Sequence, residues 1–229
     1  MRRGDQSGRP GRGVVVTIDG PAGAGKSTVA RRLAERLGFA YVNSGAIYRA
    51  VAWKASHGVP AESVLRSIDV EFVPAPGGQR VRVDGRDVTE ELYSPAVSEL
   101  AAKVSQVPAV RQFADTLQRR QATRGPVVVE GRDAGTVVFP HADCKFYLDA
   151  SPDARARRRF AEQRAGSAAG DLASIRTAIE ARDAADRTRS VAPLERSADA
   201  TYVDSSAMTV DEVVELMAKE VERTCSTRS

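Results

Sequence analysis

Residues 20–28 read Gly20-Pro-Ala-Gly-Ala-Gly-Lys26-Ser27-Thr28, after the apolar run Val14-Val-Val-Thr-Ile18 and before the helix-forming stretch 29–37. This order predicts a strand, a glycine-rich turn and the start of a helix. The first amides of a helix lack intrahelical partners, and glycines let the preceding backbone curl with its N–H groups inward. In the complete G-x-x-x-x-G-K-[ST] pattern, the lysine reaches the β- and γ-phosphates and the hydroxyl ligates Mg²⁺. The stretch therefore predicts a nucleotide phosphate site, with Ser27 as metal ligand, made by Gly20, Pro21, Ala22, Gly23, Ala24, Gly25, Lys26, Ser27 and Thr28.

Length and composition limit the class of protein. The 229 residues suit one α/β domain with insertions or two small ones. The net charge of +4 fits an anionic partner or a general preference for arginine. Cys144 and Cys225 are far apart and form no C-x-x-C motif, which favours neither disulfides nor zinc and predicts a reducing, cytoplasmic location. No apolar run reaches membrane-spanning length, and residues 1–13 are predicted to be a disordered basic tail rather than a secretory signal.

Apolar spacing predicts alternating strands and helices along the chain. Strands are expected at 14–18, 39–42, 127–129, 144–148 and 201–203, and helices from about 26 to before Gly38 and at about 44–58, 60–67, 108–121, 154–164 and 171–189. Leu172, Ile175 and Ile179 are expected on one side of the 171–189 helix. A capping box, Thr209-x-x-Glu212, opens a final helix with apolar positions at Val213, Val214, Leu216, Met217 and Val221. The alternation predicts a mostly parallel sheet covered on both faces.

One segment interrupts this alternation. Short strands at 70–73 and 81–83, followed by the Asp84-Gly85 turn, predict an antiparallel hairpin. We therefore expect residues 70–105 to be an insertion on the parallel core.

Acidic and basic residues follow the predicted strands. Glu130 ends the apolar run 127–129, as the acid of a Walker-B strand does, and competes with Asp19 for support of Mg²⁺. Arg132 and Asp133 come next, at the edge where α/β proteins bind ligands. A surface ion pair is the alternative interpretation.

A second charged group lies on the 171–189 helix. Arg182, Asp186 and Arg189 are spaced i, i+4 and i+7, so one helix face presents all three. The segment lies between two predicted flexible links, 166–170 and 191–193, which favours a mobile lid over a solvated charged helix. Arg49, behind Asn43-Ser44-Gly45, would join Arg132 and Arg189 as three guanidinium groups for one phosphate monoester.

With these residues assembled, the chain resembles the bacterial cytidylate kinases from about Val14 to Val221. The motifs that carry the resemblance are Ile18-Asp-Gly-Pro-Ala-Gly-Ala-Gly-Lys-Ser27, Ser44-Gly-Ala-Ile-Tyr-Arg49, Val83-Asp-Gly-Arg-Asp-Val88, Val104-Ser-Gln-Val107 with Pro108-Ala-Val-Arg111, Gly131-Arg-Asp133 with Gly135-Thr-Val-Val-Phe-Pro140, and Asp186-x-x-Arg189 with Val191-Ala-Pro-Leu194. The resemblance implies a P-loop three-layer α/β sandwich over residues 14–229. It also implies a nucleoside-monophosphate (NMP) arm at about 44–115, which contains the insertion, and a helical lid at about 164–192.

The resemblance further implies transfer of the ATP γ-phosphate to CMP or dCMP with Mg²⁺. Nothing in the sequence demands more than a monomer, and we expect no nucleic-acid or membrane partner. Lys26, Arg132, Arg182 and Arg189 would carry catalysis, and Arg158 would contact the donor. The acceptor would be held by Ser44, Arg49, Ser105, Arg111, Arg132, Asp133, Arg182, Asp186 and Arg189. Within this set, Arg49, Arg132 and Arg189 would grip the phosphate, Ser105, Arg111 and Asp133 would recognise cytosine, and Arg182 and Asp186 would meet the sugar. The chemistry agrees, because the cytosine N4 amino group needs a carboxylate and its O2 and N3 need donors.

The sequence departs from the family pattern at a few positions. Asn43 replaces an aspartate, and Ala185 replaces a lid arginine, which leaves Arg187, Arg155 or Arg158 to cover the donor phosphates. Two other interpretations remain open: a small P-loop kinase with another acceptor such as AMP, UMP or shikimate, and an ATP-dependent nucleic-acid-binding protein. The second would need aromatic stacking positions or a contiguous basic surface.

Overall fold

The predicted phosphate site joins the first strand to the first helix. In the computed structural model, which describes residues 13–75, 78–165 and 171–226, β1 (Val15–Asp19) leads through the glycine-rich turn into α1 (Lys26–Leu37). The helix ends at Gly38, whose φ of 67° lies in the left-handed region that glycine adopts without strain. Both boundaries agree with the sequence prediction. The predicted tail, apart from Gly13, and the predicted link at 166–170 fall outside the described residues.

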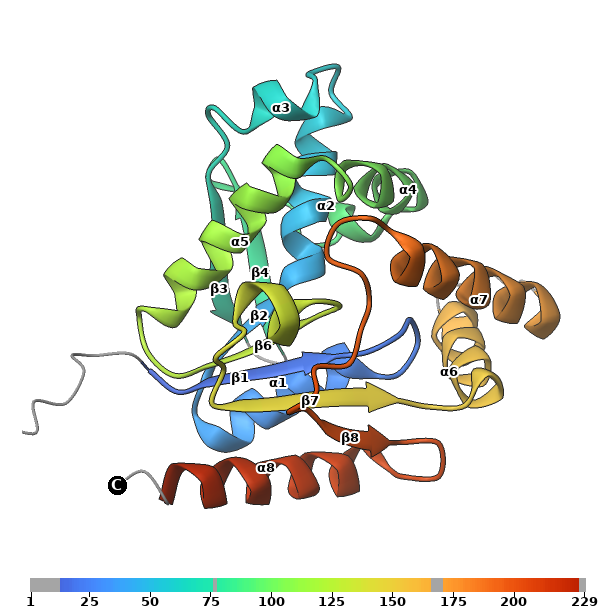
Figure 1. The fold of residues 1–229 in the computed structure, drawn as a ribbon. Helices are drawn as coiled ribbons and strands as arrows, with labels where there is room; N and C mark the ends of the chain where they lie inside the picture. The colour runs from blue at the N-terminus through green and yellow to red at the C-terminus, as the bar shows by residue number, and fades with distance from the viewer. Residues whose placement is uncertain (1–12, 76–77, 166–170, 227–229) are drawn as a thin grey trace, which may run out of the picture.

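A parallel sheet forms the centre of the molecule (Figure 1). Among the described residues it has five strands in the order β2-β6-β1-β7-β8, namely β2 (Ala40–Asn43), β6 (Val127–Gly131), β7 (Cys144–Asp149) and β8 (Thr201–Asp204) with β1 in the middle. Helices α1 and α8 (Val210–Ser226) pack on one face, and α5 (Pro108–Ala122) with a π-helical turn, η2 (Ala134–Val138), on the other. The prediction of a parallel sheet covered on both faces is confirmed.

The register of β1 decides which side chains meet at the carboxyl edge of the sheet. Val16 and Ile18 pack into the cluster with α1 and α8, so the alternating residues Thr17 and Asp19 point to the opposite face. Asp19 is aligned with Gly131 of β6. The end of β1 and the turn that follows Glu130 therefore lie side by side.

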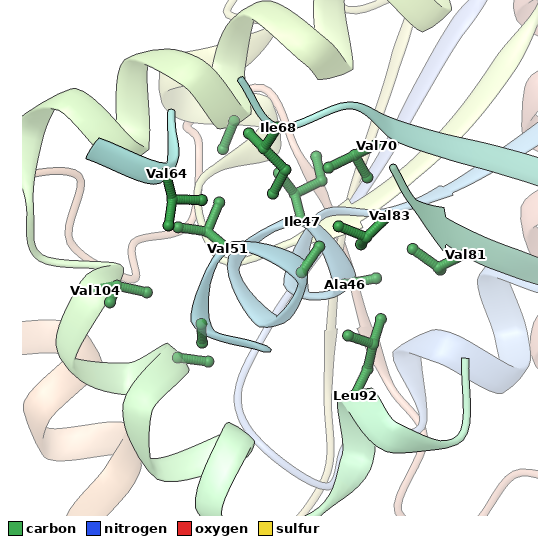
Figure 2. Packing of buried hydrophobic residues seen from close by; sticks show 14 of the residues in the cluster. Ala46, Ile47, Val51, Val64, Ile68, Val70, Val81, Val83, Leu92 and Val104 are labelled. Atoms are coloured by element: carbon green, nitrogen blue, oxygen red, sulfur yellow. The ribbon is translucent and has the colours of Figure 1, made fainter. Parts of the chain in front are cut away.

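The segment predicted to be the NMP arm, residues 44–115, is built around α2 (Ser44–Ala55). It adds α3 (Ala61–Val64), β3 (Val70–Ala75), β4 (Gly78–Val83), β5 (Arg86–Asp87), the 3-10 turn η1 (Glu91–Tyr93) and α4 (Pro95–Val104) before α5. The strands form a separate antiparallel sheet, which confirms the predicted hairpin insertion. Figure 2 shows the apolar cluster that packs around Ile47 and Val51 of α2.

Three elements of this segment, β5, η1 and α4, were not predicted. Strand β5 is only two residues long, and α4 begins at Pro95 with the Ser94 hydroxyl accepting a hydrogen bond from the Val97 amide. A serine before a proline is a recognised start signal for a helix.

Helices α6 (Pro152–Ala165) and α7 (Leu172–Thr188) form a hairpin beside the carboxyl edge of the sheet (Figure 1). Ile175 and Ile179 are buried against α6, as predicted, but Leu172 is 44% exposed because the packed part of α7 begins one turn later. The capping box of α8 is confirmed, since the Thr209 amide donates to Glu212 Oε2 at 2.7 Å. Leu216 is 41% exposed and lies to one side of the apolar stripe of α8. Among the described residues, no helix combines the length and apolarity needed to cross a membrane.

Candidate active site

The glycine-rich loop adopts backbone conformations that only glycine holds without strain. Gly23 and Gly25 have φ values of 75° and 90°, and Gly20 approaches β7 so closely that a Cβ would lie 2.0 Å from the Leu148 carbonyl oxygen. Lys26 is buried at the start of α1, and its Nζ donates to the Pro21 carbonyl at 2.7 Å across the loop. Burial holds the Lys26 pKa well below its usual range, and the positive charges of Arg132 and Arg182 lower it further.

A buried glutamate lies beside the loop hydroxyl. The Ser27 Oγ donates to Glu130 Oε2 at 2.9 Å, and the Tyr41 hydroxyl donates to Glu130 Oε1 at 2.6 Å. Burial, together with the Glu130 charge, raises the pKa of Tyr41 well above its usual value. The two hydrogen bonds hold both oxygens of Glu130 in place next to Ser27.

Asp19 binds main-chain amides of the turn that follows β6. Its two oxygens accept hydrogen bonds from the Ala134 and Gly135 amides, at 2.9 and 2.7 Å. Burial raises its pKa from 3.8 to about 6, against the lowering effect of these amides. Both oxygens of Asp19 are thus hydrogen-bonded to the π-helical turn. Of the two acids considered for support of Mg²⁺, Glu130 is the one that contacts the Ser27 hydroxyl.

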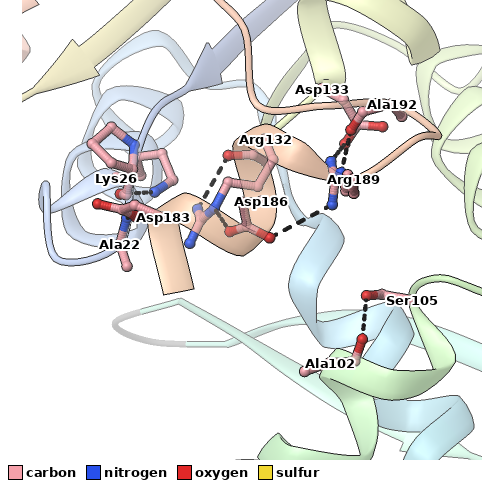
Figure 3. A network of polar contacts seen from close by, with 12 residues as sticks. Ala22, Lys26, Ala102, Ser105, Arg132, Asp133, Asp183, Asp186, Arg189 and Ala192 are labelled. Atoms are coloured by element: carbon pink, nitrogen blue, oxygen red, sulfur yellow. Dashed lines mark hydrogen bonds and ion pairs between the residues drawn. The ribbon is translucent and has the colours of Figure 1, made fainter. Parts of the chain in front are cut away.

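A chain of ion pairs continues from the carboxyl edge of the sheet (Figure 3). Arg132 Nε donates to Asp186 Oδ2 of α7 at 2.9 Å, and Arg189 Nη1 lies 3.7 Å from the other oxygen of Asp186. Arg189 Nη2 is also 3.5 Å from Asp133 Oδ1, whose second oxygen pairs with Arg111 of α5. The structure therefore brings together residues that are far apart in sequence, since Arg111 and Arg189 are separated by 78 positions.

The innermost pair is the most buried. Arg111 is 4% exposed and Asp133 is 7% exposed. Arg111 Nη1 donates to the carbonyl oxygen of Ser105 at 3.0 Å, while the Ser105 hydroxyl donates to the Ala102 carbonyl at 2.8 Å. Ser105 thus meets Arg111 through its main chain, and its side chain closes the end of α4.

Arg49 and Ser44 lie in the first turns of α2, where the predicted NMP arm begins. The Arg49 guanidinium packs 5.1 Å from the centre of the Tyr93 ring, and its buried Nε has no hydrogen-bond partner among the described residues. Burial lowers its pKa, an effect that the Glu130 charge opposes. The Ser44 hydroxyl is near Gly131, where a Cβ would lie 2.9 Å from it. Arg49 and Ser44 therefore border the same edge of the sheet as Glu130.

The three arginines considered for the donor phosphates occupy different places. Arg155 is buried and paired with Asp183. Arg187 is exposed and forms a hydrogen bond with the Tyr147 side chain. Arg158 Nη1 donates to the Ala24 carbonyl of the loop at 3.2 Å, and its Nη2 donates to the Ser205 carbonyl at 2.5 Å. Of the three, Arg158 is the half-buried arginine that borders the loop without a carboxylate partner in the described residues.

Sequence reasoning missed three functional contacts. Tyr41 carries no sequence signal beyond an aromatic residue in a strand. The double acceptor role of Asp19 depends on the π-helical turn, which no local pattern predicts. Asp183 lies next to Arg182 in a highly charged helix, and no local pattern predicts that the structure buries it to 1% exposure.

The comparisons with known proteins agree with one another. A family model for cytidylate kinase matches residues 16–223. The cytidylate kinase of Symbiobacterium thermophilum is 46% identical over 221 residues, which cover 93% of this chain and 98% of that protein. That of Pelotomaculum thermopropionicum is 46% identical over 215 residues, or 90% and 95% of the two chains. The structure of TT1252 from Thermus thermophilus, with 18% identity and a TM-score of 0.52, covers 93% of this chain and 97% of that one, and shows a shared fold.

Proposed function

The chain belongs to the cytidylate kinase family, and from that premise we propose that it phosphorylates CMP and dCMP with ATP. The observation that carries this proposal most directly is the buried Arg111–Asp133 pair with Arg189 beside it, next to a phosphate loop. A carboxylate at this depth can accept from the cytosine amino group, and Arg111 can donate to its carbonyl and ring nitrogen.

The donor side is proposed to use the loop 20–28. Its backbone amides would surround the ATP phosphates, and Lys26 would exchange its bond to Pro21 for the β- and γ-phosphates. Arg158, which already contacts Ala24, would add positive charge at the same side. We propose Arg158 for the position that Ala185 leaves without a charge.

The residues present fit a Mg²⁺ ion held mostly by the nucleotide. Among the described residues, no group of three or more His, Cys, Asp or Glu side chains could hold a metal ion by itself. Mg²⁺ in kinases takes one or two protein ligands plus phosphate oxygens and water, which matches a single hydroxyl with a supporting carboxylate. Ser27 would be the ligand and Glu130 would hold a bound water. When bound, the ion neutralises charge on the phosphates.

The acceptor phosphate is proposed to lie among Arg49, Arg132 and Arg189. Arg132 and Arg189 are held by Asp186, which keeps both guanidinium groups at the edge of the sheet. Arg182 and Asp186 would meet the ribose. The Ser105 carbonyl accepts a hydrogen bond from Arg111 and so orients the arginine that would bind cytosine. The Ser105 hydroxyl would bind cytosine directly only after it breaks its hydrogen bond to the Ala102 carbonyl. Ser44, beside Gly131, would complete the phosphate end of the site.

The reaction proceeds by in-line attack. An oxygen of the CMP phosphate forms a bond to the γ-phosphorus of ATP as the bond to the β,γ-bridging oxygen breaks, and ADP leaves. No general base is required, because the attacking phosphate is already an anion. Lys26, Arg132, Arg182 and Arg189 would stabilise the negative charge that spreads over the transferred group. Positioning of the two phosphates supplies most of the remaining rate.

We also propose the division of labour among the parts of the chain. Residues 44–115 would close over CMP as a unit, because they pack around their own apolar cluster. Residues 164–192 would act as the lid that excludes water during transfer. We expect the protein to act as a monomer in the cytoplasm.

The deciding experiment is a steady-state assay with ATP and Mg²⁺ across CMP, dCMP, UMP and AMP. CMP and dCMP should be phosphorylated with kcat/KM at least about tenfold above UMP and AMP, the factor that one lost hydrogen bond of about 1.4 kcal/mol produces. Preference for AMP or UMP would support another P-loop kinase instead. The relative rates of CMP and dCMP would show whether Arg182 and Asp186 distinguish the two sugars.

A further inference from the structure

Asp183 of α7 is the most deeply buried acid that the proposed chemistry does not use. It is 1% exposed. Its Oδ1 accepts a hydrogen bond from the Ala22 amide of the phosphate loop at 2.8 Å, and its Oδ2 pairs with Nη1 of Arg155. Figure 3 shows Asp183 beside Ala22 and Lys26. A residue of the lid helix therefore bonds directly to the main chain of the loop.

Arg155 binds the carbonyl group of the same residue. Its Nη1 donates to the Ala22 carbonyl at 3.0 Å, and its Nε donates to the Ala150 carbonyl at 3.0 Å. Both the N–H and the C=O of Ala22 are thus bound by side chains of the α6–α7 hairpin. Four hydrogen-bonding contacts join Ala22, Arg155, Asp183 and Ala150, all of which are buried, so each contact is little weakened by solvent.

Apolar packing brings the hairpin against the loop at the same point. Ala22 belongs to a small buried cluster with Ala156 of α6 and Ile175 and Ile179 of α7. Gly23 follows, and a Cβ there would lie 3.2 Å from the Arg155 Cβ and from its carbonyl oxygen. The loop and the hairpin are in close contact, so neither can shift alone without breaking this packing.

The same helix carries residues that are proposed to bind CMP. Arg182 precedes Asp183, and Asp186 follows it within one helical turn and holds Arg132. We propose that Asp183 is a positioning residue that fixes α7 to the phosphate loop, so that binding of ATP at the loop and binding of CMP at the arginines favour each other. This inference rests on the proposed function, because it assigns the two ends of the contact to donor and acceptor.

Stability alone does not account for such a pair. Replacing a buried ion pair by apolar residues of similar volume is often neutral for stability or increases it. An orientation role, in contrast, is lost whenever the contact is lost. The two roles can therefore be separated by a measurement of linkage between the ligands.

The test measures the dissociation constant of CMP by calorimetry, with and without a saturating non-hydrolysable ATP analogue. In the wild type the analogue should tighten CMP binding at least about fivefold, within the usual range of coupling between sites. In Asp183→Ala, which leaves no oxygen to accept from the Ala22 amide, the factor should fall to about twofold or less. Glu180→Gln is the matched control, because Glu180 lies one turn away on α7 and forms only an exposed pair with Arg176, Nε to Oε1 at 2.9 Å, in the described residues. It should keep the wild-type factor.

Two further measurements keep the inference testable if Asp183→Ala does not fold. The double variant Asp183→Leu with Arg155→Met removes both buried charges together and should fold, with the linkage lost. In the wild type, CMP alone should slow hydrogen exchange of the Ala22 amide, because ordering α7 strengthens its bond to Asp183. An unchanged linkage in a folded variant, no linkage in the wild type, or unchanged Ala22 exchange would overturn the inference. Failure of the proposed function is a separate result, seen as absence of CMP phosphorylation by the wild type.

Discussion

Replacement of Asp133 by asparagine should remove much of the use of CMP while leaving the use of ATP almost unchanged. Asp133 is 7% exposed, pairs with Arg111 and lies 3.5 Å from Arg189 Nη2. Asparagine keeps the shape but loses the charge and turns one acceptor into a donor. Loss of a charge-assisted hydrogen bond typically costs about 1.5–3 kcal/mol. Because 1.36 kcal/mol is a factor of ten in rate, kcat/KM for CMP should fall about 10- to 150-fold.

The choice of asparagine over alanine follows from burial. Asp133→Ala would leave Arg111, which is 4% exposed, without its carboxylate, and breaking a buried pair in this way costs about 3–5 kcal/mol of stability. Folding and specificity would then be lost together. The asparagine side chain can still accept one hydrogen bond from Arg111.

The assay compares kcat/KM for CMP at saturating ATP with kcat/KM for ATP at saturating CMP. Glu99→Gln serves as the control on the arm that carries Arg111, because its exposed pair with Lys103 lies on the surface of α4. Equal losses on the two substrates would show that Asp133 acts on the whole site, and the cytosine assignment would be falsified. An unchanged kcat/KM for CMP would reject it as well.

Other expected outcomes concern the phosphate loop and its support. Lys26→Ala should lower kcat by about 10²–10³-fold, as loss of one transition-state donor does, with circular dichroism unchanged; a loss below about tenfold would contradict its role. Arg158→Ala should raise KM for ATP more than KM for CMP, whereas Arg187→Ala should change neither. Because burial raises the Asp19 pKa from 3.8 to about 6, the folded state binds this proton more tightly than the unfolded state. The free energy of unfolding of the wild type, relative to that of Asp19→Asn, should therefore fall by up to about 3 kcal/mol as the pH rises from about 4 to about 7. Denaturant titration of both proteins measures this difference. A difference that does not change with pH would contradict the raised pKa of Asp19.

The sequence predicts the central fold well because the signals for it are local. The spacing from Gly20 to Lys26 places a turn between a strand and a helix, and Gly38 ends that helix in the expected left-handed conformation. Alternating apolar runs predict the covered sheet, and the 70–105 hairpin interrupts it as expected. Elements shorter than one helical turn or with unusual hydrogen bonding, such as β5 and η2, give no comparable signal.

The candidate site is predicted less completely, because its geometry depends on contacts between distant segments. The residues proposed to bind CMP can all be identified from sequence motifs. The ion pairs that these residues form with one another cannot. Arg111 reaches Asp133 only because α5 lies on the face of the sheet to which Asp19 points. Likewise, the main-chain contact of Ser105 with Arg111 depends on the turn between α4 and α5, not on the residue type.

The two buried aspartates that flank the phosphate loop explain how one short loop can organise two binding sites. Asp19, immediately before Gly20, binds the amides of the turn that follows Asp133. Asp183 binds the Ala22 amide from the helix that carries Asp186. Each carboxylate accepts main-chain N–H groups, so each fixes backbone positions and not merely side chains. The loop is therefore joined on one side to the turn that follows Asp133, which is proposed to recognise cytosine, and on the other to the helix proposed to meet the sugar.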